Sequence, residues 1–109
     1  MAYTPKRFVG PKFLVPLATT PVITFSKPGI IKQIMFSNVF SGDLLYNLYL
    51  AKSGEDAQEF NKIIPQGNAP AASITLIDLA LVVNAGDKIY CTAAVPNGLI
   101  LTISGVEIS

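Results

Sequence analysis

The sequence predicts an all-β protein: a single-domain, antiparallel β-sandwich that is jelly-roll-like and has an extended N-terminal arm. Short apolar, β-branched segments recur along the chain, and turn-forming residues separate them at the spacing of small sandwiches, of which the immunoglobulin-like type is the alternative. The chain has 109 residues, which is enough for one core but not for two. We therefore expect an arm at residues 1–12 and a β-sandwich domain at residues 13–109.

The first twelve residues, MAYTPKRFVGPK, are expected to be irregular because Pro5, Gly10 and Pro11 disfavour regular structure. Three basic side chains in this arm suit an acidic partner surface, and its aromatic and apolar side chains are unusual for a bare tail. The residues expected to dock on a partner are Tyr3, Lys6, Arg7, Phe8, Val9 and Lys12. A frayed terminus without a function is the alternative.

The expected strands are runs of apolar and β-branched residues of suitable length. They span residues 13–17, 21–26, 30–39, 44–51, 60–65, 74–83, 88–95 and 99–108, the run at 60–65 being a short edge strand. Turn and loop signals separate them, chiefly Gly, Pro, Asn, Asp and Ser. These signals lie at residues 18–20, 27–29, 41–43, 52–58, 66–72, 84–87 and 96–98, the last being a Pro-Asn-Gly hairpin turn.

Alternation of side chains predicts which residues face the core. In 30–39, one face carries Ile30, Lys32, Ile34 and Phe36, and the other Gln33 and Ser37. In 44–51, one face carries Leu44, Tyr46, Leu48 and Leu50. In 88–95, the inward residues are Ile89, Cys91 and Ala93, and the outward ones Lys88, Tyr90 and Thr92. The segment 74–83 also matches one face of a helix, but its length and the surrounding β pattern favour a strand.

Charged residues make up only 14% of the chain, whereas half of its residues are apolar. Ordinary soluble domains contain roughly 25% charged residues, which keep their surfaces soluble and separate. We therefore expect copies of the chain or another partner to cover much of the exterior. The longest apolar run, residues 79–83, is too short to span a membrane. No secretory signal is recognisable, and a net charge of +1 argues against a nucleic-acid partner.

The residue types argue against an enzyme, so no catalytic, cofactor-binding or metal site is expected. The chain has no histidine, which removes the commonest general base and metal ligand. The single cysteine, Cys91, is expected to be a small core residue. Glu55, Asp56 and Glu59 cluster in one loop near Asp43, but their spacing lacks the alternating ligands of a calcium loop. A solvated loop is the expected role.

The chain resembles a type of small β-sandwich protein from the virions of tailed bacteriophages. The similar segments are MAYTPKR, IIKQIMFSNVFSGDLLYNLYLAKSG and LALVVNAGDKIYCTAAVPNGLILTISGVEIS, and together they cover nearly the whole chain. Their order and spacing carry the resemblance. It implies a virion location after assembly in the host cytoplasm, as a capsid decoration (cement) protein or as a neck, tail, baseplate or fibre component.

A decoration protein is favoured because the chain has one domain and no long repeat or coiled coil. The resemblance implies a homotrimer that binds the major capsid protein or other virion proteins on the capsid exterior and stabilises the capsid. We expect Tyr46, Tyr49 and Tyr90 to lie at the subunit interface. In the alternative of a receptor- or glycan-binding module, the same tyrosines would be binding platforms.

Overall fold

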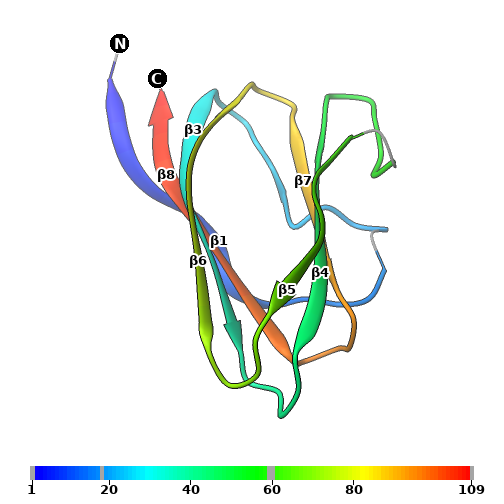
Figure 1. Ribbon diagram of the computed structural model, residues 1–109. Coiled ribbons are helices and arrows are strands. Elements are labelled where there is room, and N and C mark those ends of the chain that lie inside the picture. Colours follow the sequence, from blue (N-terminus) through cyan, green and yellow to red (C-terminus); the bar gives the residue numbers. More distant parts are fainter. Residues whose placement is uncertain (1, 18, 59–60, 109) are drawn as a thin grey trace.

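The computed structural model describes residues 2–17, 19–58 and 61–108 and consists of two packed β-sheets (Figure 1). Eight strands form them. They are β1 (Tyr3–Phe13), β2 (Ile23–Thr24), β3 (Gly29–Asn38), β4 (Leu44–Ala51), β5 (Lys62–Ala69), β6 (Ile74–Val83), β7 (Lys88–Ala93) and β8 (Leu99–Ile108).

One sheet, here called the β1 sheet, has the order β1-β8-β3-β6, and the other, the β4 sheet, has the order β2-β7-β4-β5. All pairs of named strands are antiparallel. The chain changes sheet at every connection except the one between β4 and β5, so most neighbouring strands are far apart in sequence. This order is that of an eight-stranded jelly roll. The predicted fold class is therefore confirmed.

The core lies between the inner faces of the two sheets, as alternation along the strands requires. Phe36 on β3 and Tyr46 on β4 join the sheets through stacked rings, with centroids 3.9 Å apart and planes at 30°. Around them pack fully buried aliphatic residues from both sheets. The largest of these are Leu14, Ile31, Ile34, Leu48, Ile89, Leu99, Leu101 and Ile103.

The strand β3 contains a register shift between Ile31 and Gln33, and this shift changes which side chains face the core. Ile31 is buried before the shift, and Ile34 and Phe36 are buried after it. Simple alternation placed Ile30 and Lys32 on the buried face, and that prediction was wrong because an irregular pairing shifts the phase of the pleat.

The expectation that residues 1–12 are irregular was also wrong for most of this segment. Tyr3–Phe13 forms β1, which pairs with β8 from Tyr3–Ile108 to Phe13–Ile100. Strand β1 is an edge strand, where proline is tolerated because one side of the backbone needs no ladder bonds. At Gly10, φ is +89° and an added Cβ would collide with the Leu101 carbonyl, so glycine is required.

Other element boundaries also differ from the predictions, and three differences are the largest. Residues 13–17 form no separate strand, and Val15 makes only an isolated bridge to Thr92. Strand β2 is limited to two residues of the expected 21–26. Strand β5 extends to Ala69, through part of the expected loop at 66–72. Residue 18 of the predicted turn at 18–20 and residue 60 of the predicted strand at 60–65 lie outside the described residues, as does residue 59.

Candidate interaction surface

The N-terminal residues expected to dock on a partner are divided between the core and the surface. Val9 is buried in the core, and Phe8 packs against that core with its ring edge on Phe25, at a centroid distance of 5.2 Å. The structure thus corrects their expected insertion between subunits, because the register shifts in β1 direct both side chains inward. Tyr3, Lys6, Arg7 and Lys12 are exposed.

Lys6 is tied to the last strand rather than extended toward a partner. Its ammonium group donates a 2.8 Å hydrogen bond to Glu107 Oε2 on β8. This hydrogen bond lowers the pKa of Glu107, with smaller contributions from the charges of Lys6 and Lys27, while partial desolvation opposes it. The pair links the two terminal strands β1 and β8, which lie side by side in Figure 1.

Two of the three tyrosines expected at a subunit interface belong to the interior of the chain. Tyr46 is only 4% exposed because its ring stacks on Phe36, and burial, with a further contribution from Cys91, raises its pKa. Tyr90 is 3% exposed, and its hydroxyl donates a 3.4 Å hydrogen bond to Asp56. The expected role of both as interface residues or glycan platforms is therefore corrected, and Tyr49 alone remains partly exposed.

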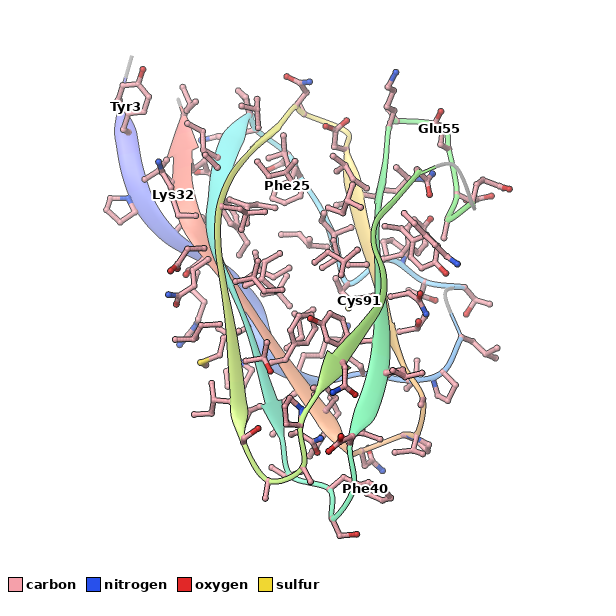
Figure 2. All side chains as sticks on the ribbon, viewed as in Figure 1. Tyr3, Phe25, Lys32, Phe40, Glu55 and Cys91 are labelled. Carbon is pink, nitrogen blue, oxygen red and sulfur yellow. The ribbon has the colours of Figure 1, made fainter. Side chains whose placement is uncertain are left out.

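The Cys91 thiol lies in the core, as predicted (Figure 2). Burial raises its pKa, and a backbone hydrogen bond at Thr92 offsets this only in part. A thiol with a raised pKa is a poor nucleophile at neutral pH.

Three of the acidic side chains close turns or loops. Glu55 accepts from the Lys52 amide, Asp43 from the Ala71 amide and Asp87 from the Asn84 amide, each at 2.9 Å. Glu59 lies outside the described residues. Among the described side chains, no group of three or more potential ligands is close enough to hold a metal ion.

A cleft of about 640 Å³ opens between the 52–58 loop and the turn at 84–87. Its described lining residues are Leu50, Lys52, Ser53, Glu55, Asn61, Ile63, Val82, Asn84 and Asp87. Glu55, Asn61 and Asp87 already accept backbone hydrogen bonds that hold the loop and the turn. The cleft is therefore a consequence of how the loop and the turn fold. The carboxylates of Glu55 and Asp87 stabilise these segments by accepting backbone hydrogen bonds.

The surface that the sequence reasoning did not identify is the side of the β1 sheet that faces away from the core, here called the outer face. The strand registers align its residues in four rows across the sheet. From one end these are Phe13–Ile100–Ser37–Ile74, then Thr102–Met35–Leu76, then Arg7–Ser104–Gln33–Asp78, and last Pro5–Val106–Ile30–Val82.

The outer face is largely apolar and accessible. Ile74, Leu76 and Val82 on β6 are 62%, 56% and 62% exposed, and Phe13 on β1 is 46% exposed. In Figure 1 no other segment of the described residues lies over this side of the sheet, and Figure 2 shows Lys32 on this side. A broad apolar patch on a small domain indicates an interaction surface.

The alternation of side chains in residues 74–83 could have identified the residues that β6 contributes to the outer face. Ile74, Leu76, Ala80 and Val82 are exposed, whereas the alternate residues are partly or fully buried. Both sets are apolar, however, so the sequence does not show which of them faces out.

Comparison of the chain with protein-family models, with curated proteins and with solved structures found no match. The described part of the chain contains no helix able to cross a membrane.

Proposed function

We propose that this chain is a virion structural protein, specifically a capsid decoration protein that binds the capsid exterior as a homotrimer and stabilises it. The observation that carries the proposal is the outer face. A rigid four-stranded sheet presents apolar side chains that a solitary small domain has no reason to expose. Such a face suits a protein that works within an assembly.

The fold and the sequence resemblance add support of different kinds. The jelly roll is an architecture found in viral capsid proteins, although it also occurs in lectins and cupins, so the fold alone does not decide function. Among these classes of jelly-roll protein, the resemblance to small virion proteins of tailed phages favours a virion protein. Three further parts of the proposal also depend on this resemblance: the trimeric state, the major capsid protein as the partner and assembly in the host cytoplasm.

The structure favours a mechanical role over a catalytic one. The carboxylates of Asp43, Glu55 and Asp87 are held in turns and loops, and the Cys91 thiol is buried. Exposed Tyr3 and Lys12 on β1 remain suited to docking on an acidic capsid surface. A rigid block fixed across neighbouring capsid subunits would oppose their separation under the pressure of packaged DNA.

The number of copies per particle tests this function. Quantitative mass spectrometry of purified virions should find the chain in hundreds of copies if it decorates the capsid. Three, six or twelve copies would instead assign it to the neck, tail or baseplate. Its absence from virions would contradict a virion role altogether.

A receptor- or glycan-binding role depended on three exposed tyrosines, and two of them, Tyr46 and Tyr90, are buried. This role is therefore less well supported. A glycan array probed with the purified chain tests it directly. Specific binding would favour this role over decoration.

A further inference from the structure

The charges on the outer face are separated across the sheet. Arg7 lies on β1, the first strand of the sheet, and Asp78 lies on β6, the last, and both belong to the row that continues through Ser104 and Gln33. Within the described part of the chain neither Arg7 nor Lys32 has an ion-pair partner. Among the described residues, Asp78 accepts only a 3.2 Å hydrogen bond, from the Gln33 side chain. One edge is therefore cationic and the other anionic.

We propose that a second copy of this chain packs on the outer face, with the two β1 sheets face to face about a two-fold axis parallel to the strands. Rotation about this axis places the strands of the second copy in the reverse order across the interface. Each residue keeps its height along the strand direction. Strand β1 then faces β6 of the second copy, and β8 faces β3. Arg7 consequently faces Asp78 of the second copy, and the same pair forms again on the other side of the axis.

The first and last rows also bring apolar residues of the two copies together under this operation. In the last row, Pro5 faces Val82 of the second copy, and Val106 faces Ile30. In the first row, Phe13 faces Ile74 of the second copy. Apolar side chains thus meet apolar ones at both ends of the face, and the polar row between them sets the register. A two-fold contact requires this self-complementarity of one surface.

The cationic edge also has a suitable shape. Arg7, Lys32 and Ser104 border a shallow hollow of the outer face, together with Pro5, Lys6 and Gly105. The opposing β6 of the second copy brings its exposed Asp78 over this hollow. Lys32, on the inner strand β3, also borders this hollow and adds positive charge to it. Complementary charge of this kind selects the partner and its orientation.

The area is sufficient for a specific contact of modest strength. Four strands about 4.8 Å apart, with about ten residues each at ~3.3 Å per residue, cover roughly 600 Å². Two such faces bury roughly 1,200 Å², the lower end of the range for stable protein interfaces.

This inference does not rest on the proposed function. It is compatible with a trimer, since each copy of a trimer still presents its outer face to a copy in a neighbouring trimer. On a capsid, such contacts would link adjacent trimers into a continuous network.

Charge reversal and mixing test the contact in solution. Sedimentation of the purified wild-type chain should show pairing, as dimers or as paired trimers, below about 100 μM. The variants Arg7→Glu and Asp78→Lys each place like charges opposite one another twice, so each should weaken pairing by at least about tenfold. An equimolar mixture of the two variants should recover pairing, because every facing pair is then of opposite charge.

The variant Lys12→Glu is the matched control. It makes the same change of charge on β1, but Lys12 pairs with the inward-facing Leu101 and so belongs to the other side of the strand. It should pair like the wild type. If either charge reversal unfolds the chain by circular dichroism, Arg7→Gln and Asp78→Asn replace them, with an expected weakening of roughly threefold each.

Three results would overturn the inference: no pairing of the wild type at these concentrations, single reversals that pair as well as the wild type, or a mixture that fails to recover pairing. Because these measurements use no virions, none of the results affects the copy-number test of the proposed function.

Discussion

Replacing Tyr46 with alanine distinguishes a core residue from an interface residue. Tyr46 is 4% exposed and stacks on the fully buried Phe36, so its removal leaves a cavity between the two sheets. Truncation of a buried aromatic side chain costs about 3–5 kcal/mol, and the lost stacking accounts for roughly 1 kcal/mol beyond the lost burial. The stability of a small domain is only about 5–15 kcal/mol.

Urea denaturation followed by circular dichroism measures this loss. With a slope of about 1–2 kcal/mol per molar urea, a loss of about 4 kcal/mol lowers the midpoint by at least about 2 M. Tyr49→Ala is the control on the same strand. Tyr49 is partly exposed, and the Lys62 ammonium lies 5.8 Å from its ring centroid, so its removal should cost about 1 kcal/mol or less.

Equal midpoints for Tyr46→Ala and Tyr49→Ala would refute this reasoning. They would mean that Tyr46 contributes no more packing than a side chain at the surface. A surface position would also restore the original expectation that this tyrosine contacts a partner.

Three other predictions follow from the contacts of β1, β7 and β8. Deletion of residues 1–12 removes nearly all of β1 and exposes the edge of β8, so thermal unfolding should shift to a clearly lower temperature; an unchanged transition would mean that this strand is dispensable. Cys91 should react with a thiol reagent at neutral pH only as fast as the chain opens, because burial raises the thiol pKa and blocks access; rapid stoichiometric labelling of the folded chain would contradict this. Since the pKa of Glu107 is lowered by Lys6 in the folded chain, its contribution to stability is present above the ordinary carboxyl pKa and is lost as pH falls through the folded value. The wild type should thus be slightly more resistant to urea than Glu107→Gln at neutral pH but not in acid, and a difference that persists in acid would argue against the charge interaction.

Local patterns in the sequence predicted several elements closely. Strands β4, β6 and β8 span the predicted residues 44–51, 74–83 and 99–108. In β4 the buried positions Leu44, Tyr46 and Leu48 follow the predicted alternation. Such agreement is expected where turn residues mark both ends of a strand and its pairing is regular.

The candidate surface was less predictable, for reasons that concern pairing between distant segments. The docking residues were sought in an irregular arm, but Phe8 and Val9 pack inward once β1 pairs with β8 at the opposite end of the chain. The outer face was missed because each strand contributes only a few of its residues. The rows that join Arg7 to Asp78 exist only when four strands are in register.

The sequence by itself determined an all-β sandwich, most of its strands and a low content of charged residues, because composition and alternation are local properties of the chain. Only the tertiary structure decided that the N-terminal segment is an edge strand, that β3 changes phase at Lys32 and which apolar side of β6 faces outward. The physical reason is that backbone pairing and burial depend on which distant strand lies alongside, and residues adjacent in sequence do not specify that neighbour.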